Sequence, residues 1–246
     1  MDLEKRHTTS RLVASALFVE AAQAQAELAR IDHKVLTQLR LGMIEDFDSG
    51  VTPALLSQLT REMPSTQFLL ETGASHHLFD QLETRALDVI VATEMGSAAS
   101  WMQVFPLMVE PFVAVAPKGA IPGPEDRQKL LEMPLIRYTS RHHMGRVISD
   151  HLVRQNLTLA HRFELDSYHA IMAMVANGAG WSILTPLGVT HAKRFHVSVD
   201  VFPLPFPPLS RTLSQFPRLD ILVDLPDIIS SPLPPLLSDP LRRPHF

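Results

Sequence analysis

Apolar residues recur at alternating intervals of three and four along residues 8 to 35. The series consists of Ala14, Leu17, Ala21, Ala24, Leu28, Ile31 and Val35. In a helix this spacing puts all the side chains on one face over three heptads, as in the seam of a coiled coil. We therefore predict one long helix at residues 8–35. Its apolar face either pairs with a second copy of the chain or lies against its own domain.

After Val35 the pattern changes to short apolar strands that alternate with amphipathic helices. The expected elements are strands around residues 39–43, 68–70 and 88–93, and helices from Thr52 and from about Ser75 to Arg85. Thr52 is the expected N-cap of the first helix, because Pro53 suits the first helical position. A second set of the same kind runs from Leu135 to Pro186. This alternation predicts parallel sheets, so we expect an α/β fold with two lobes.

The two sets imply two lobes joined by two crossings of the chain. The crossings are expected near Ala116–Pro117 and near residues 201–205. The predicted division is residues 1–35 for the helix, 36–116 with 204–246 for lobe I, and 117–203 for lobe II. Eleven of the 20 prolines fall between Pro203 and Pro244. Because proline interrupts helices, we expect extended or irregular chain after about Ser230.

The segment SYHAIMAMVANGAGWSILTP, residues 167–186, predicts a helix that turns directly into a buried strand. Gly178 stands where a helix needs a left-handed C-terminal cap, and Gly180 keeps the turn tight. A short apolar strand follows, which Pro186 ends. The amino-acid sequence of this segment closely resembles part of the effector-binding domain of LysR-type transcriptional regulators. That family usually has an aliphatic pair where this chain has Trp181-Ser182.

Further motifs of the same family occur in the expected order over roughly residues 1–225. They are Leu39 to Phe47, Pro53-Ala-Leu-Leu, Arg61 to Pro64, Leu82 to Ala92, Pro106 to Pro117 and Leu135 to Tyr138. The resemblance implies a two-lobed, type II periplasmic-binding-protein-like fold that binds a ligand between its lobes. It also implies that the helix at residues 8–35 is a linker helix through which such regulators form homodimers or tetramers.

The start of the chain resembles a fragment of a DNA-binding domain. Leu3 to Arg6 and Arg11-Leu12 are similar to the end of the wing in the family's winged helix-turn-helix. The recognition helix that should precede this fragment is missing from the sequence. We therefore expect contact with DNA only through a domain absent from this chain. A shortened chain, a late start codon and a naturally short relative are explanations that the sequence leaves open.

Composition narrows the classes of function. A formal net charge of −4 argues against nucleic-acid binding by these residues, because DNA-binding modules are usually basic. The absence of cysteine excludes disulfides, a thiolate nucleophile and cysteine-ligated metals. No apolar run approaches the ~20 residues of a membrane span, and the N-terminus has no secretory pattern. We therefore expect a cytoplasmic protein with no membrane partner.

In a two-lobed α/β protein, ligands lie at the carboxyl ends of the strands, where helix N-termini offer free amides. Helix starts of this kind are expected in the loop Glu45 to Thr52 and at Gly73 to Ser75, Ser140 to Gly145 and Asp166-Ser167. The resemblance implies ligand contacts near Ser49, Ser75, Thr93, His142, Met144 and Ser167. The serines and threonines at helix starts have a second interpretation, as N-caps with no ligand role.

Two arginines and one tyrosine complete the predicted site. Arg141 and Arg146 are candidate anchors for an anion, because a guanidinium binds a carboxylate in a bidentate manner. Their alternative interpretation is as surface residues at a helix start. Tyr168 adds an amphipathic ring beside Ser167. The predicted ligand-binding residues are therefore Ser49, Ser75, Thr93, Arg141, His142, Met144, Arg146, Ser167 and Tyr168.

No catalytic, cofactor or metal site is expected. The chain has no nucleophile elbow, no P-loop and no dinucleotide-binding glycine motif. The adjacent pairs His76-His77 and His142-His143 each offer at most one good metal ligand, because neighbouring side chains diverge. Glu45, Asp46 and Asp48 form an acidic loop that is expected to be solvated or to cap a helix. This loop disfavours an anionic ligand, whereas the helix starts favour one.

The predicted function is the small-molecule sensing part of a LysR-type regulator, with a small organic effector in the cleft between the lobes. An anionic effector is favoured, and homodimers or tetramers are expected. A free-standing solute-binding protein of the same fold is the first alternative. An enzyme built on that fold is the second, and the missing catalytic constellation argues against it.

Overall fold

The computed structural model describes residues 36–48, 50–96, 99–218, 229 and 233. The predicted helix at residues 8–35 and the predicted ligand residue Ser49 lie outside these ranges. The same holds for the proline-rich tail, apart from Ile229 and Leu233, which are helical and fully buried. Among the described residues, no helix combines the length and the apolar character that crossing a membrane requires.

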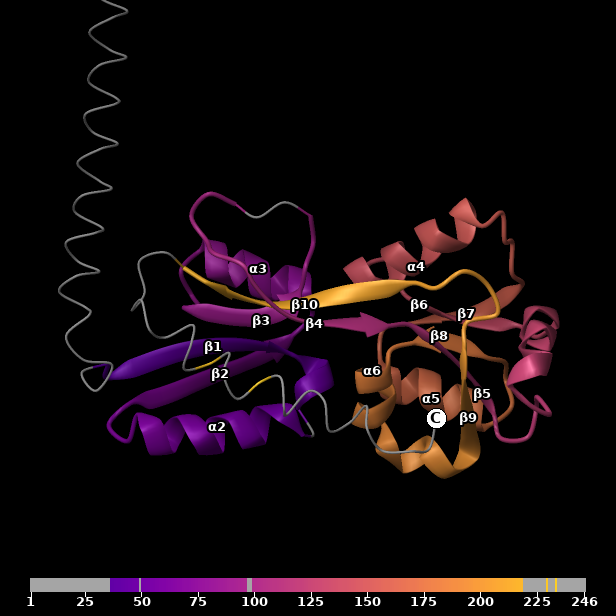
Figure 1. Ribbon diagram of the computed structural model, residues 1–246, viewed down its shortest axis with the longest axis horizontal. Helices are drawn as coiled ribbons and strands as arrows, with labels where there is room; N and C mark the ends of the chain where they lie inside the picture. Colours follow the sequence, from indigo (N-terminus) through magenta and orange to yellow (C-terminus); the bar gives the residue numbers. More distant parts are fainter. Residues whose placement is uncertain (1–35, 49, 97–98, 219–228, 230–232, 234–246) are drawn as a thin grey trace, which may run out of the picture.

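The first body of the fold, here called lobe I, is built around a five-stranded sheet (Figure 1). In sheet order its strands are β2 (Gln67–Gly73), β1 (Gln38–Ile44), β3 (Val89–Thr93), β10 (Ser210–Pro217) and β4 (Phe105–Pro111). β1 pairs in parallel with β2 and β3, as predicted. β10 pairs antiparallel with both β3 and β4, because the chain returns to this sheet from the other body.

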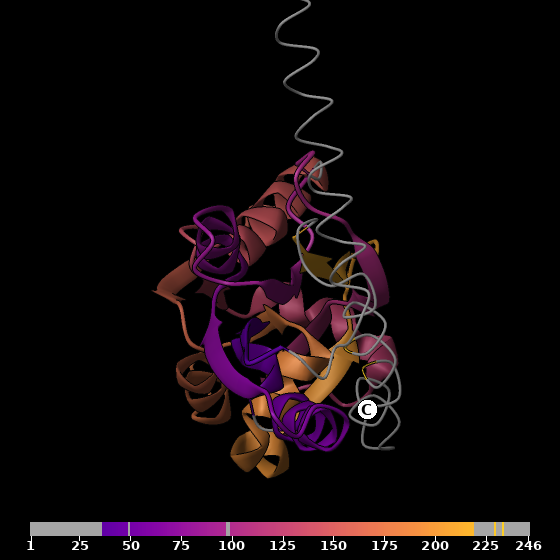
Figure 2. The ribbon, with the colours of Figure 1, turned by 90° about the vertical axis from the view of Figure 1, so that its left-hand side faces the viewer.

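Helices cover both faces of this sheet. α2 (Val51–Glu62) and α3 (Ser75–Glu83) lie on opposite faces of it, as Figures 1 and 2 show from two directions. β3 is buried along its whole length, which agrees with its uninterrupted apolar run. The core on both faces consists mainly of leucine, isoleucine, valine and methionine, including Leu41, Met43, Leu55, Leu59, Leu78 and Ile90.

The second body, here called lobe II, contains two smaller sheets. One has the order β8 (Ser182–Leu184), β5 (Val113–Pro117) and β9 (Val199–Pro203), and all its pairs are antiparallel. The other pairs β6 (Leu135–Tyr138) in parallel with β7 (His161–Leu165). A bridge between Leu135 and Trp181 connects the two sheets. The helical elements are α4 (His143–Arg154), α5 (Tyr168–Ala176), α6 (Pro186–His191), η3 (Pro124–Glu132) and η4 (Lys193–Ser198).

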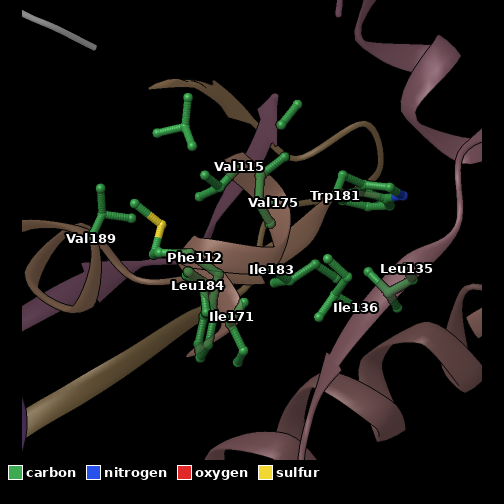
Figure 3. Close-up of a cluster of buried hydrophobic side chains, with 14 of the residues drawn as sticks. Phe112, Val115, Leu135, Ile136, Ile171, Val175, Trp181, Ile183, Leu184 and Val189 are labelled. Atoms are coloured by element: carbon green, nitrogen blue, oxygen red, sulfur yellow. The ribbon is translucent and has the colours of Figure 1, made fainter. Parts of the chain in front are cut away.

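The helix-to-strand joint of residues 167–186 forms as predicted. α5 ends at Ala176, Gly178 has a φ of 78°, and β8 follows directly. Gly180 has a φ of 148°, and a Cβ at this position would lie 2.1 Å from the carbonyl oxygen of Pro134. Trp181 is therefore carried into the centre of lobe II, where side chains of α5, β5, β6 and β8 meet (Figure 3). Pro186 ends the strand and also begins α6.

The chain crosses between the lobes twice. The first crossing follows β4, since β5 at Val113–Pro117 already pairs with β8 and β9 of lobe II. It thus lies a few residues before the expected position near Ala116–Pro117. The second crossing connects β9 to β10, after Pro203. The predicted division of the chain into residues 1–35, 36–116 with 204–246, and 117–203 stays a prediction.

The predicted N-cap of α2 is wrong. The helix begins at Val51, with Gly50 in the N-cap position, and Thr52 lies inside the first turn. Val51 and Thr52 are both buried. The helix starts earlier because Val51 contributes to the core of lobe I. The hydroxyl of Thr52 has no hydrogen-bond partner within the described part of the chain.

Candidate ligand-binding site

Two adjoining hollows lie where the lobes meet. The smaller one, here called the small hollow, has a volume of about 50 Å³. It is lined by Ile44, Glu45, Asp46, Gly73, Ala74, Ser75, His76, Thr93, Tyr138, His142, His143, Met144, Tyr168 and Arg211. The larger one, the large hollow, has a volume of about 310 Å³. It is lined by Thr93, Glu94, Gly96, Phe112, His143, Met144, Val147, Ser210, Arg211 and Thr212.

Five of the predicted ligand residues come together at these hollows. Ser75, Thr93, His142, Met144 and Tyr168 all line the small hollow, and Thr93 and Met144 line the large one as well. They stand at the end of β3 and at the starts of α3, α4 and α5. The first amides of a helix have no carbonyl partner within it, so these starts offer free donors to a ligand.

The other predicted residues lie elsewhere. The side chain of Arg141 is 79% exposed and lies 3.6 Å from Asp166. Arg146 donates from Nη1 to the carbonyl oxygen of Arg141 at 2.8 Å, so it closes the loop before α4. Ser167 occupies the N-cap position of α5, but its side chain makes no capping bond among the described residues. These three residues are not among those that line the hollows, and Ser49 lies outside the described ranges.

Ser75 and Gly145 fix the helix starts against the strands. The hydroxyl of Ser75 accepts a hydrogen bond from the amide of Thr93 at 3.2 Å, which ties the start of α3 to the end of β3. Ser75 is the first residue of that helix, and Ala74 precedes it in the N-cap position. At the start of α4, a Cβ on Gly145 would lie 1.9 Å from the carbonyl oxygen of Thr139. Glycine is thus required where α4 begins next to the end of β6.

A buried ion network that the sequence did not reveal forms the floor of both hollows. Arg211, at the start of β10, donates from Nε to Glu110 Oε2 at 2.7 Å and from Nη2 to Asp46. Nη2 also bonds the hydroxyl of Thr185 at 3.2 Å. The second oxygen of Glu110 accepts the amide of Leu187 at 2.7 Å. The network therefore joins the short helix η2 (Glu45–Phe47), which follows β1, and the strands β4 and β10 to the chain that follows β8 in lobe II.

Asp46 departs from its predicted role. The acidic loop was expected to be solvated or to cap a helix, but Asp46 is 8% exposed and pairs with Arg211. No local signal could have shown this, because 165 residues separate the two partners. Glu45 and Asp48 of the same loop are exposed residues. Their carboxyl groups are nevertheless partly buried, which raises the pKa of both.

Tyr168 connects the network to lobe II. Its hydroxyl donates to Asp46 Oδ2 at 3.0 Å and lies 3.3 Å from Met144 Sδ. The ring of Tyr138 lies beside it, with 5.5 Å between the centroids, and the Tyr138 hydroxyl donates to the carbonyl oxygen of Asp166 at 3.1 Å. Burial raises the pKa of both tyrosines well above the ordinary value. Both hydroxyls therefore keep their protons at neutral pH.

Histidines line the mouth of the small hollow from both lobes. His76 on α3 and His142 before α4 have ring centroids 5.4 Å apart. Burial, with smaller contributions from His77, His142 and Arg146, lowers the pKa of His76. Burial and Arg146 likewise lower the pKa of His143. His76 and His143 thus carry little positive charge at neutral pH, and the described residues contain no group of three side chains suited to a metal ion.

A family model matches most of the chain. The model describes the LysR substrate binding domain, and it matches residues 34–214. No curated protein sequence is similar enough to count as a match.

Solved structures with the same arrangement of lobes include LysR-type regulatory proteins. A cysteine mutant of OxyR from Corynebacterium glutamicum superposes with a TM-score of 0.70 at 17% identity, over 97% of this chain and 74% of that one. A full-length cysteine-to-aspartate variant of OxyR from Pseudomonas aeruginosa gives 0.66 at 25% identity, over 91% and 79%. The effector-binding domain of QuiR in complex with shikimate gives 0.66 at 14% identity, over 83% and 99%.

Proposed function

Since this chain belongs to the LysR substrate-binding domain family, we propose that the two hollows are where it binds a small organic effector. Its fold is the type II periplasmic-binding-protein-like fold. Effector sensing in a LysR-type regulator is the function that follows from the family match and from the regulatory domains among the structural neighbours. The position of the effector and the residues that contact it are the proposal.

One observation carries the proposal: helix starts from both lobes meet at the small hollow. α3 belongs to lobe I, whereas α4 and α5 belong to lobe II. A molecule bound there contacts both bodies and stabilises one relative placement over others. Such differential contact is what a ligand needs to shift a conformational equilibrium. The signal would then pass to the rest of the regulator through the relative position of the lobes.

The lining suggests distinct roles for the predicted residues. An acceptor group of the effector, such as a carboxylate, would bind the free amides at the starts of α3 and α4. The hydroxyls of Ser75 and Thr93 can add hydrogen bonds there, while Tyr168 is held by Asp46. His142 and Met144 supply the wall from lobe II. We assign no contact with the effector to Arg141, Arg146 or Ser167.

LysR-type regulators are oligomeric, and we propose a homodimer or a tetramer for this chain. The apolar stripe of residues 8–35 supports self-association, although those residues lie outside the described ranges. β2 supports it as well, because this strand is the edge of its sheet and exposes Leu69 and Leu70. We propose that contact with DNA is made by a part of the regulator other than this domain. We also propose that the regulator acts in the cytoplasm.

The experiment is a thermal-shift screen of small metabolites with the full chain and two variants. An effector at 100 times its dissociation constant stabilises the folded state by about 2.7 kcal/mol, or several degrees in Tm. Ser75→Phe should abolish the shift, because the ring fills the small hollow. Ser57→Phe is the matched control, since Ser57 is exposed on α2.

Ser75 also accepts the Thr93 amide, so the unliganded stability of Ser75→Phe has to be measured first. Ser75→Ala removes the hydroxyl without blocking the hollow and should weaken binding only partly. If a confirmed effector binds folded Ser75→Phe with full affinity, the proposed position is wrong.

A further inference from the structure

The two hollows differ in the charge that faces a ligand. The small hollow has the helix starts of α3, α4 and α5 in its wall, and each contributes partial positive charge. Among the described residues, the large hollow is lined by one carboxylate side chain, that of Glu94, together with Arg211, His143, hydroxyl groups and apolar side chains. This contrast bears on what the effector is, and it rests on the proposed function above.

Glu94 is held in place with one oxygen unused. Its amide donates to the carbonyl oxygen of Thr212 at 2.9 Å, which extends the pairing of β3 with β10. The hydroxyl of Ser214 donates to Glu94 Oε1. The other carboxylate oxygen has no hydrogen-bond partner among residues 36–48, 50–96 and 99–218. It is therefore available to a donor group that enters the large hollow.

Among the described residues that line the large hollow, no cation is free to neutralise Glu94. Arg211 lines the same hollow, but its Nε and Nη2 atoms are bound by Glu110 and Asp46, two buried carboxylates. Its Nη1 atom makes a long contact of 3.4 Å with Thr93. Burial and Arg146 lower the pKa of His143, which disfavours its charged form. The large hollow is thus electrostatically suited to a positive donor group.

The small hollow has the opposite preference. Arg211 there offsets Asp46, and the starts of three helices line the same space. Glu45 opposes this preference, although partial burial of its carboxyl group and the neighbouring Asp46 raise its pKa. An acceptor group with negative charge is therefore best placed in the small hollow.

We propose that the effector is an amino carboxylate, with its carboxylate at the starts of α3 and α4 and its ammonium group beside Glu94. Thr93 and Met144 line both hollows, so they lie along the part of the ligand between its charges. Phe112 and Val147 supply apolar contact for a carbon chain, while Ser210 and Thr212 offer oxygen acceptors around the ammonium. A volume of about 310 Å³ reaches the lower end of ordinary ligand sites.

The test uses calorimetry and thermal shift on the full chain with a defined set of probes. The set contains the proteinogenic amino acids and the straight ω-amino acids from glycine to 6-aminohexanoate, each at about 10 mM. Each binder is compared with its matched carboxylate without the amine and its matched amine without the carboxylate. At least one amino carboxylate should bind, and both matched analogues should bind about tenfold or more weakly, because each loses a charge-assisted hydrogen bond.

Glu94→Gln then tests the residue itself. This change keeps the shape of the side chain and an acceptor for Ser214, but it removes the charge. It should weaken the amino carboxylate about tenfold and leave the matched carboxylate unchanged. Glu94→Asp, which keeps the charge, should retain part of the preference if Glu94→Gln proves unstable. Glu132→Gln is the control, because Glu132 is an exposed residue of η3.

Three results would overturn the inference. One is that no member of the amino carboxylate set binds. Another is that the matched carboxylate binds as tightly as the amino carboxylate. The third is that Glu94→Gln changes neither affinity. If a metabolite of another class binds and Ser75→Phe abolishes its binding, the proposed function stands and only this inference fails.

Discussion

Two arginines, Arg211 at the floor of the hollows and Arg141 at the surface, have opposite environments. The side chain of Arg211 is 6% exposed and is paired with both Asp46 and Glu110. Arg141 is 79% exposed, and its nearest carboxylate, Asp166, is 57% exposed. Exposed pairs contribute about 0–1 kcal/mol, whereas breaking a buried pair costs about 3–5 kcal/mol. The residue type alone therefore says little about the importance of a charge, and burial with its partners decides it.

The largest effect is expected from Arg211→Met. This change keeps much of the side-chain volume but leaves Asp46 and Glu110 buried without a cation. The free energy of unfolding, measured by urea titration, should fall by about 3–5 kcal/mol. Arg141→Met is the matched control and should change it by less than about 1 kcal/mol.

Equal, small losses in the two arginine variants would contradict the contrast between the buried network and the surface. An Arg211 variant that does not fold beside a normally folded Arg141 variant would agree with it. The Arg141 variant also tests the candidate site. A large loss of affinity for a confirmed effector would mean that Arg141 reaches the ligand after all.

A smaller effect is expected from Tyr168→Phe, which removes the donor to Asp46 that joins lobe II to the buried network. Hydrogen bonds to charged groups contribute about 1.5–3 kcal/mol, so stability should fall by roughly that amount. Tyr138→Phe is the comparison, because that hydroxyl donates to an uncharged carbonyl oxygen. Its loss should be about 0.5–1.5 kcal/mol. Urea titrations that give the reverse order would show that Asp46 does not depend on Tyr168.

The smallest effect concerns the exposed loop before α4. Glu164 accepts the Ser140 amide at 3.1 Å and the Thr139 hydroxyl at 3.0 Å, and these bonds lower the pKa of its carboxyl group. A carboxylate with a lowered folded pKa adds stability above its unfolded value of about 4.3, and this stability is lost as the pH falls through the folded value. Glu164→Gln should thus be slightly less stable than the wild type at pH 7.

Urea titrations from pH 7 down to pH 3 should show this small difference shrinking in acid. Because Glu164 is exposed, the difference at pH 7 should not exceed about 1 kcal/mol. A difference that grows in acid would contradict the lowered pKa. A difference of several kcal/mol at pH 7 would place this loop in the same class as the buried network.

Much of the fold followed from local patterns. The structure of residues 167–186 follows from their local sequence. Gly178 and Gly180 adopt positive φ values, and the apolar residues mark the helix and the strand. The buried run at residues 88–93 was equally clear. The cap at Thr52 was wrong because burial of Val51, a tertiary effect, set the start of the helix.

The sequence placed part of the hollow lining, whereas contact of these residues with a ligand stays a prediction. Ser75, Thr93, His142, Met144 and Tyr168 converge on the hollows, since the carboxyl ends of strands and the starts of the following helices meet there. Arg141 and Arg146 were reasonable candidates by residue type, but their side chains bind local groups at the surface. The position of Glu94 in the large hollow could not be predicted, because a single glutamate after a strand has no distinguishing sequence pattern.

By itself the sequence determined the α/β alternation, the family and the helix starts that line the hollows, because each depends on residues close together in the chain. Only the tertiary structure decided which charges are buried. Arg211 lies 165 residues from Asp46 and 101 residues from Glu110, and no periodicity links such distant positions. A charge becomes a structural or binding element only when distant segments remove it from water and supply its partners. Which charges are buried therefore depends on how the lobes pack and not on the local elements alone.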